Sequence, residues 1–413
     1  MMKRIAVVGS GIAGLTTAYY LSRKHQVALF EADSRLGGHT HTTAVDWQGE
    51  QSAIDTGFIV FNDRTYPGFI RLMTELGVDF QPTEMSFSVS NPAIGLEYNG
   101  NNLSSLFAQR RNLMNAGFWR MLTDVIRFNR QVRQAAAEAP STLTLGEFLD
   151  RQSYGVLFID NYLLPMISAI WSTDLEQTRE FPLLFFVRFF ENHGLLNLVD
   201  RPQWYTIKGG SSSYIEPLTA PFKDGIQLGT RVESIKRQPD AVKIVAKDQE
   251  SSYDEVVLAC HADQALCLLT EPTAAERQVL GAFRFSANDV ILHTDQRWLP
   301  QNPRAWASWN YHLRRPGQGP STVTYYMNRL QCLDKQHAYL VTLNEEIPPA
   351  AVIGSYQYDH PIFDLESIAA QQQWQQVSGI DRIHYCGAWW HNGFHEDGVQ
   401  SALRVCAALG VLP

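Results

Sequence analysis

The feature that most constrains the fold is a glycine pattern near the start of the chain. Gly9 and Gly11 follow a short apolar run at residues 4–8, and Gly14 lies near the start of residues 12–23, where Ala and Leu recur at helical spacing. This order predicts a buried parallel strand, a glycine turn and a helix. The first glycine allows the tight turn, the second lets the backbone approach a pyrophosphate, and the third permits close helix-to-strand packing. Because the first N–H groups of a helix attract phosphate, the pattern predicts a dinucleotide-binding site.

An acidic residue follows the second predicted strand, at residues 27–30. The carboxylate of Glu31 can accept hydrogen bonds from ribose hydroxyls and would repel a 2′-phosphate, so an NADP-type ligand is disfavoured. Arg35, Gly37 and Gly38 come next. This arginine and glycine pair resembles the signature of flavoproteins with two dinucleotide-binding domains. The resemblance implies FAD rather than NAD, with the arginine beside the cofactor.

The end of the chain predicts a last parallel strand over residues 383–388, with a turn at Gly387 and Ala388, and a closing helix that starts near residue 397. With these motifs the chain resembles the flavin-containing amine oxidase, protoporphyrinogen oxidase and phytoene desaturase superfamily along almost its whole length. Three stretches, residues 305–311, 324–331 and 393–398, are similar to a bacterial branch of predicted NAD/FAD-binding amine oxidoreductases. Amine oxidases usually place Asp after the last glycine, whereas Ala388 resembles the desaturases.

The resemblance implies further cofactor contacts in the middle of the chain. Gly57 would bring backbone against the flavin ring, and the backbone of Val232 would meet the adenine. The residues expected to bind the cofactor are Gly9, Gly11, Ile12, Ala13, Gly14, Glu31, Ala32, Arg35, Gly37, Gly38, His39, Thr40, Thr56, Gly57, Phe58, Val232, Gly387, Ala388, Gly398 and Val399. Non-covalent FAD is expected, although Cys386 and His39 are conceivable attachment points.

The predicted fold is α/β, with a Rossmann-type FAD-binding domain built on a parallel sheet and a second α+β domain of antiparallel strands and helices that binds substrate. The FAD-binding domain is expected to be discontinuous, over residues 1–80, 200–285 and 375–413, and the substrate domain to comprise residues 81–199 and 286–374. A small antiparallel unit is expected at residues 231–259. Strands of the second domain are expected at residues 289–293, 305–311, 322–327, 338–343 and 351–356.

Composition and charge restrict the kinds of partner and the cellular location that we expect. The net charge of −8 and the lack of a basic stripe argue against nucleic acid. Five cysteines without CxxC spacing fit reduced thiols, and hence a cytoplasmic protein.

The apolar run after Met1 to Arg4 is about five residues, too short for a signal peptide. The apolar run at residues 181–190 is shorter than the ~20 residues of a spanning helix, so no transmembrane segment is predicted; core or cavity wall is favoured over peripheral membrane contact. Nothing indicates an oligomeric state.

Trp389, Trp390 and His395 are expected above the flavin ring as catalytic residues, because they lie on the turn between the last strand and the closing helix. The alternative is that the tryptophans pack in the core and that His395 is a hydrogen-bonded loop residue. His391 and His395 have a spacing that metal ligands can have, but Gly393 between them favours a loop, and no metal is predicted.

These features predict an FAD-dependent oxidoreductase that transfers a hydride to flavin N5 from an amine or from an activated C–C unit of an apolar small molecule. One alternative is a desaturase or isomerase of the same fold that acts on a fatty-acyl or isoprenoid chain. A different kind of alternative is a flavin-binding or redox-sensing protein without turnover. The sequence lacks the Ser-His-Asp, Cys-His and Walker patterns that would favour a hydrolase or a phosphotransferase.

Overall fold

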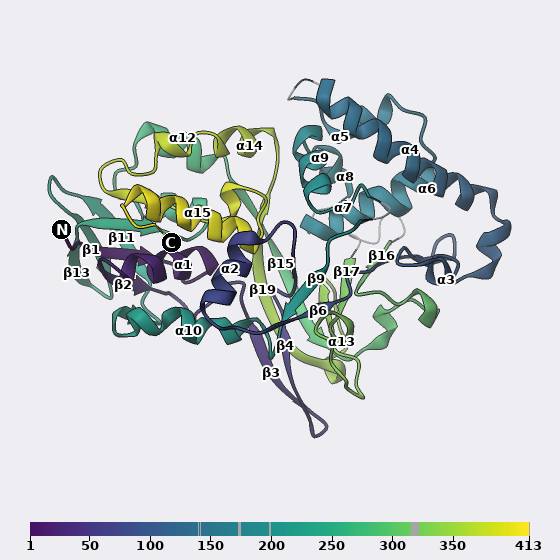
Figure 1. Ribbon diagram of the computed structural model, residues 1–413, viewed down its shortest axis with the longest axis horizontal. Coiled ribbons are helices and arrows are strands. Elements are labelled where there is room, and N and C mark those ends of the chain that lie inside the picture. The colour runs from purple at the N-terminus through teal and green to yellow at the C-terminus, as the bar shows by residue number, and fades with distance from the viewer. Residues whose placement is uncertain (139, 141, 172–174, 198–199, 315–321, 413) are drawn as a thin grey trace.

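A computed structural model describes residues 1–138, 140, 142–171, 175–197, 200–314 and 322–412. The chain forms two lobes, and both termini lie in the lobe that is on the left in Figure 1. Each lobe has its own cluster of buried apolar side chains. The mixed α/β architecture, with a parallel sheet in one lobe, confirms the predicted fold class.

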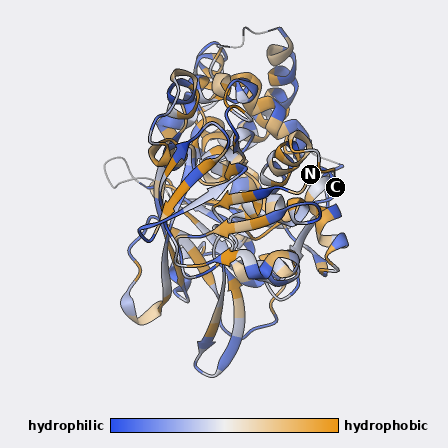
Figure 2. Cartoon of the chain, turned by 90° about the vertical axis from the view of Figure 1, so that its left-hand side faces the viewer, coloured by the Kyte–Doolittle hydropathy of each residue, from blue (hydrophilic) through white to orange (hydrophobic). Residues whose placement is uncertain are grey.

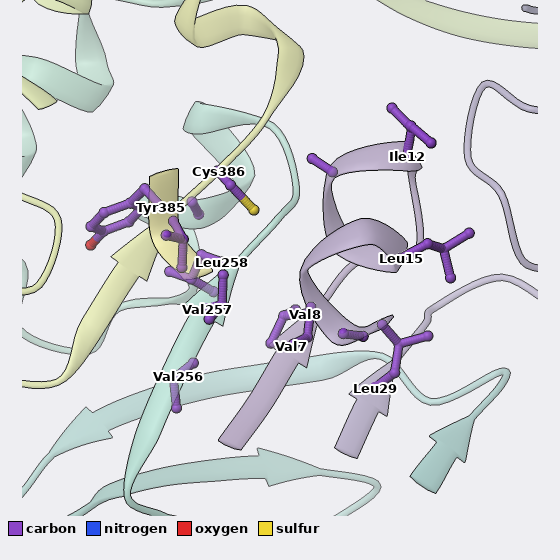
Figure 3. Packing of buried hydrophobic residues seen from close by; sticks show 14 of the residues in the cluster. Val7, Val8, Ile12, Leu15, Leu29, Val256, Val257, Leu258, Tyr385 and Cys386 are labelled. Carbon is purple, nitrogen blue, oxygen red and sulfur yellow. The ribbon is translucent and has the colours of Figure 1, made fainter. Parts of the chain in front are cut away.

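The lobe that carries the termini is built on a five-stranded parallel sheet in the order β10-β2-β1-β14-β20. Its strands are β1 (Arg4–Val8), β2 (Gln26–Phe30), β10 (Ile226–Gln227), β14 (Glu255–Leu258) and β20 (Ile383–Tyr385). Val8 at the end of β1 pairs with Phe30 on one side and with Leu258 on the other. Figure 2 shows hydrophobic residues along strands inside the molecule, and Figure 3 shows side chains of β1, β2 and β14, among them Val8, Leu29 and Leu258, around the helix after β1. Because both faces of this parallel sheet are covered, its strands can be continuous apolar runs rather than alternating ones.

Helices α1 (Ile12–Ser22) and α15 (His395–Ala408) pack against each other beside the sheet. The other helices of this lobe are α2 (Pro67–Glu75), α10 (Ile215–Thr219), α11 (Ala262–Leu268), α12 (Ala274–Gly281) and α14 (Leu365–Gln371). The predicted antiparallel unit is present as β11 (Val232–Arg237), β12 (Val242–Ala246) and β13 (Gln249–Tyr253). The predicted first helix and closing helix are also confirmed, although the closing helix starts two residues earlier than expected.

The second lobe contains a seven-stranded sheet in the order β19-β15-β18-β17-β16-β7-β8. Its strands are β7 (Phe87–Asn91), β8 (Leu96–Asn99), β15 (Arg284–His293), β16 (Trp309–His312), β17 (Thr322–Tyr326), β18 (Leu340–Leu343) and β19 (Val352–Ile362). The five strands expected to form an antiparallel sheet do pair antiparallel, as β15 to β19, and β7 joins this sheet by pairing in parallel with β16. Strand β19 extends beyond the predicted residues 351–356 because β15 pairs with it along its whole length.

Helices cover this sheet (Figure 1): α4 (Ala116–Glu138), α5 (Leu145–Asp150), α6 (Val156–Phe158), α7 (Leu164–Trp171), α8 (Leu175–Arg179) and α9 (Leu183–Asn192). Shorter elements are α3 (Leu103–Leu106), α13 (Met327–Leu330), the hairpin of β3 (Thr42–Trp47) and β4 (Glu50–Asp55), and a small sheet of β5 (Phe61–Asn62), β6 (Phe80–Thr83) and β9 (Trp204–Ile207). The aromatic side chains of α9 are buried, which confirms the core alternative for residues 181–190. Within the described ranges, no helix combines the length and the apolarity that crossing a membrane needs.

The two buried clusters support the predicted division of the chain into two domains. The residue boundaries of these domains stay a prediction. The first cluster draws on residues 5–73, 207–283 and 370–411. The second draws mainly on residues 89–196 and 290–363, but it also includes Val45 and Ile54 of the β3–β4 hairpin. The hairpin was expected in the FAD-binding domain, and its apolar side chains instead pack with the second lobe.

Candidate flavin site

The glycine turn between β1 and α1 has the geometry of a phosphate-binding loop. Gly9 has φ +103°, in the left-handed region that favours glycine. A Cβ atom on Gly14 would lie 2.0 Å from the carbonyl oxygen of Gly9, so only glycine fits between helix and strand. A Cβ atom on Gly11 would meet nothing within 4 Å, and no side chain caps the start of α1. The start of α1 thus has no side-chain cap, and Gly11 leaves room beside it for an anion that would bind the first N–H groups.

Glu31 and Arg35 hold this loop together. The carboxylate of Glu31 accepts a hydrogen bond from the backbone N–H of Ser10 at 2.9 Å and another from that of Asp33 at 2.9 Å. Arg35 donates to the carbonyl oxygens of Gly38 at 2.8 Å and Thr40 at 3.3 Å. The side chain of Arg35 therefore stabilises the diglycine turn by binding the backbone carbonyl oxygens of that turn. Glu31 stands at the carboxyl end of β2, beside the loop, as a ribose-binding carboxylate requires.

A cavity of about 430 Å³ begins at this loop and runs into the second lobe. Twelve of the predicted site residues line it: Gly11, Ile12, Ala13, Gly37, His39, Thr56, Gly57, Phe58, Gly387, Ala388, Trp389 and His395. The others lie outside its lining: Gly9, Gly14, Glu31, Ala32, Arg35, Gly38, Thr40, Val232, Trp390, Gly398 and Val399. The structure thus brings the N-terminal loop and the turn after β20 to one cavity, as predicted for residues from opposite ends of the chain.

Three histidines meet on this cavity. The ring of His39 lies 6.1 Å from the ring of His261 and 5.7 Å from that of His360, centroid to centroid. Burial, and secondarily the neighbouring imidazoles, lowers the pKa of His39 to about 3. Burial lowers the pKa of His360 to about 4 and also lowers that of His261. The Nε2 atom of His39 is buried without a hydrogen-bond partner among the described residues. These imidazoles are therefore neutral donors and acceptors at neutral pH.

His395 stands at the first position of α15 and is held from two sides. Its ring stacks on Phe58 with centroids 3.5 Å apart. Its Nε2 lies 3.0 Å from the hydroxyl oxygen of Thr40 and 3.1 Å from that of Tyr214. Burial moves the pKa of His395 well below its ordinary value, so this ring is also neutral. Trp389 is fixed in the cavity wall because its Nε1 donates to the carbonyl oxygen of Cys260 at 3.1 Å.

Trp390 does not face the cavity. Its side chain is 1% exposed and packs on Phe283 and Trp389, with ring centroids 5.3 Å and 4.4 Å away. The structure therefore supports the packing alternative for this residue and gives no support to its expected catalytic role. Trp389, its neighbour in the same 3₁₀ turn, lines the cavity, and Trp390 does not.

Two glycines have packing reasons that the sequence reasoning did not supply. A Cβ atom on Gly57 would lie 2.0 Å from the carbonyl oxygen of His39, so this glycine is required by the neighbouring turn that contains His39. A Cβ atom on Gly398 would lie 2.6 Å from Cγ2 of Ile12, and Val399 is buried in the same contact between α15 and α1. Both residues therefore have a packing role at the contact between α15 and α1, and their expected flavin contact stays a prediction.

Several cavity residues were missed from the sequence. In the second lobe the lining is mostly aromatic or aliphatic, and includes Tyr98, Tyr162, Met166, Ile170, Trp171, Trp309 and Tyr325. Phe189 also lines the cavity, and it belongs to residues 181–190, for which core or cavity wall is expected. Tyr358 and His360 of β19 also line it, and the hydroxyl of Tyr358 hydrogen-bonds Thr56 at 2.9 Å. Their two-residue spacing places both side chains on one face of a strand, which was the available signal. The helical residues carried no such signal.

The described residues fit a bound flavin dinucleotide: the open N–H groups at Gly11 suit a pyrophosphate, and the cavity beyond them suits a flat ring. In the same ranges, no group of three or more His, Cys, Asp and Glu side chains is arranged to hold a metal ion. The site therefore offers a nucleotide loop joined to an apolar chamber.

Comparisons with known proteins agree with this geometry. Coproporphyrinogen III oxidase of Staphylococcus aureus (strain NCTC 8325 / PS 47) is 24% identical over 299 residues, which cover 62% of this chain and 60% of that protein. Two solved structures share the fold over 99% of both chains: cyclohexylamine oxidase from Brevibacterium oxydans IH-35A, with 16% identity and a TM-score of 0.70, and the CLA-producing fatty acid isomerase from P. acnes, with 14% identity and a TM-score of 0.71. The family model described as flavin containing amine oxidoreductase matches residues 12–332. The chain therefore belongs to the flavin containing amine oxidoreductase family, which confirms the resemblance and implies a flavin cofactor.

Proposed function

We propose that the protein is an oxidoreductase that holds FAD non-covalently and oxidises a C–H bond of an apolar small molecule. The bond belongs to an activated C–C unit or to the carbon beside an amine that enters uncharged. One observation carries the proposal: a single cavity joins the glycine loop after β1 to a chamber of aromatic and aliphatic side chains. The end of this cavity at the glycine loop can receive the cofactor, and the chamber beyond it can receive an apolar substrate.

The nucleotide end is supported by the loop geometry. The start of α1 offers its N–H groups and its dipole to the pyrophosphate, with Gly11 leaving room for close approach. The carboxylate of Glu31 offers acceptor oxygens for ribose hydroxyls, and its charge disfavours a 2′-phosphate.

The chamber is suited to a neutral substrate. Of the side chains that line it, the charged ones are Arg201 and Asp359, and the five histidines have lowered pKa values because they are buried. Burial lowers the pKa of His193 to about 4, for example. An ammonium ion would lose its hydration here with little compensation, and such unpaired burial is costly. The chamber therefore favours an apolar chain or a deprotonated amine.

A bound flavin supplies a two-electron acceptor, so the protein itself has to position the substrate and keep water away. The aromatic wall, including Trp389 and Phe58, excludes water. The neutral rings of His39 and His360 can accept or donate a single hydrogen bond to a polar group of the substrate. His395 is held by Thr40 and Tyr214 at the edge of the same space and completes the wall.

The surroundings of two cysteine thiols indicate whether FAD could be attached covalently. Cys386 is fully buried, lies outside the cavity lining and hydrogen-bonds Thr17. Cys260 lines the cavity, but burial raises its pKa to about 12, so it stays protonated and a weak nucleophile. Both observations support non-covalent binding. All five cysteines are free, which supports the predicted cytoplasmic location.

The test starts with the colour of the purified protein and with acid precipitation. We expect a yellow protein whose flavin is released into the supernatant as FAD; flavin that stays with the pellet would contradict non-covalent binding. Anaerobic bleaching is then followed with a primary amine across pH and with an unsaturated apolar chain. Faster bleaching by the amine above its own pKa, or bleaching by the apolar chain, supports the proposal. A yellow protein that no donor bleaches would favour a flavin-binding protein without turnover.

A further inference from the structure

Exposed apolar side chains gather at the end of the molecule farthest from the termini. They belong to the β7–β8 turn, to α3, to the 3₁₀ helix at Arg110–Met114, to α4 and to the start of α6, which lie together at the right in Figure 1. The residues, with their exposed fractions, are Ile94 (56%), Leu103 (75%), Leu113 (46%), Met114 (91%), Trp119 (47%), Ile126 (57%) and Val156 (71%). We call this set the α3–α4 surface. Scattered exposed apolar residues need no explanation, but a gathered set marks an interaction site.

Contacts between the segments show that the surface is continuous. The ring of Phe107, which follows α3, lies 5.4 Å from the ring of Trp119 in α4. The Nε1 of Trp119 donates to the carbonyl oxygen of Leu113 at 3.0 Å. Gln109 donates to the carbonyl oxygen of Gly95 in the β7–β8 turn at 3.0 Å, and the N–H of Gly155 donates to Asp124 of α4 at 2.8 Å.

The solvent-exposed side of helix α4 is part of this surface, and it carries both apolar and charged residues. Trp119, Ile126 and Arg130 are exposed and are seven and four residues apart, which places them on one side of the helix. Phe118, Met121, Val125 and Phe128 are buried on the opposite side. The apolar residues of the solvent face are therefore not required by the core of the lobe.

The charge of this region is opposite to that of the whole protein. Residues 92–134 contain six arginines, at positions 110, 111, 120, 127, 130 and 133, and two acidic residues, Glu97 and Asp124. Both acidic side chains are buried, and Asp124 is paired with Arg127 at 3.1 Å and with Arg120 at 3.9 Å. Arg133 is paired with Glu191 of α9 at 3.0 Å. The chain as a whole carries a net charge of −8. The α3–α4 surface is thus a basic, apolar region on an acidic protein.

We propose that the α3–α4 surface docks the protein on a lipid bilayer that carries anionic headgroups. Apolar side chains interleaved with arginines are the composition of interfacial elements, in which the apolar groups enter the boundary of the acyl region and the cations lie at the phosphates. Charge complementarity favours an anionic membrane, since the rest of the protein would be repelled by it.

The cavity opens within this surface. Three of its lining residues are exposed, Gly100, Asn101 and Arg201, and the first two precede Leu103 of this surface by three and two residues. Docking would therefore place one opening of the chamber at the bilayer, so that an apolar substrate enters without crossing water. This consequence rests on the proposed function, whereas docking itself does not.

The experiment measures co-sedimentation of the full-length protein with vesicles, without any substrate, so that its result is independent of the oxidation chemistry. Vesicles of phosphatidylcholine alone are compared with vesicles that contain one third phosphatidylglycerol, at ~0.05 and ~0.5 M salt. We expect binding to the anionic vesicles at low salt and its loss at high salt. Arg110→Gln with Arg130→Gln should weaken binding about 25-fold, at about fivefold for each charge.

A second variant tests the apolar part. Leu103→Gln with Met114→Gln should weaken binding by about tenfold or more, because each buried methylene contributes to interfacial binding. The matched control is Leu228→Gln with Leu412→Gln, two exposed apolar residues outside the surface, and it should bind like the wild type. Unchanged thermal midpoints show that all variants are folded. Equal binding to both kinds of vesicle would overturn the proposal. Absence of vesicle binding, together with a dimer that Met114→Gln dissolves, would also overturn it, because a second copy of the chain would then cover the surface.

Discussion

Gly11 and Gly14 provide a matched pair of substitutions that separates binding from folding. Both lie in the loop and first turn that follow β1, and each is changed to alanine. A methyl group on Gly11 would meet nothing within 4 Å, whereas one on Gly14 would lie 2.0 Å from a backbone oxygen of Gly9 and 3.1 Å from Cβ of Ala259. The same chemical change is therefore made once in open space and once inside a packed contact.

The expected magnitudes follow from these distances. Gly11 has φ −64°, which alanine adopts without strain, so Gly11→Ala should stabilise the flavin-free protein by about 0.4–1 kcal/mol through the unfolded chain. Its methyl group occupies the approach to the N–H groups of α1, and FAD affinity should fall tenfold or more. Gly14→Ala gains about 1 kcal/mol of helix propensity but overpacks the contact with Gly9, where a cost of about 1–3 kcal/mol or more is expected. Its net effect should be destabilising.

The assay combines urea unfolding of the flavin-free proteins with FAD titration followed by flavin fluorescence. Gly11→Ala should show a normal or raised unfolding midpoint with weakened binding, and Gly14→Ala a lowered midpoint. Full FAD affinity in Gly11→Ala would refute the assignment of this loop to the pyrophosphate, because the added methyl group cannot avoid a phosphate held there.

Three further predictions concern the carboxylates and the tryptophan turn. Glu31→Ala should weaken FAD at least tenfold, because a charged hydrogen-bond acceptor contributes about 1.5–3 kcal/mol, and tight NADP binding by the wild type in the same titration would contradict the role of Glu31. Trp390→Ala should lower the thermal midpoint and the flavin content together, since loss of a buried tryptophan costs about 3–5 kcal/mol; slowed flavin reduction with an unchanged midpoint would instead return Trp390 to the site. Burial raises the pKa of Asp55 from 3.8 to about 6, so between these pH values the unfolded chain loses a proton that the folded protein keeps. The free energy of unfolding should therefore fall by about 3 kcal/mol as pH rises from about 4 to above 6, and urea titrations in which Asp55→Asn has the same pH dependence as the wild type would disprove this.

The nucleotide half of the site could be predicted because its information is local. The strand, the turn and the helix that contain Gly9, Gly11 and Gly14 are contiguous, and Arg35 shapes a turn only three residues away. Glycine at a positive φ, an apolar run and a helical period each report on the conformation of their own segment. Such signals survive without knowledge of distant partners.

The chamber could not be predicted in this way because its walls come from segments far apart in the chain. His39 meets His360 across more than three hundred residues, and the direction of each ring depends on how β19 pairs with β15. Trp389 and Trp390 illustrate the same limit, since one lines the cavity and the other packs in the core although they are neighbours. Their identity was visible in the sequence, but their orientation was not.

The amino-acid sequence alone was enough to infer that the chain holds a nucleotide loop, that its first and last strands join one parallel sheet, and that the chain resembles flavin proteins. Only the tertiary structure decided that the loop opens into an apolar chamber with neutral histidines, and that apolar residues near α4 remain outside the core. The physical reason is that backbone conformation follows from neighbouring residues, whereas burial, pKa and exposure of a side chain follow from whatever distant segment packs against it.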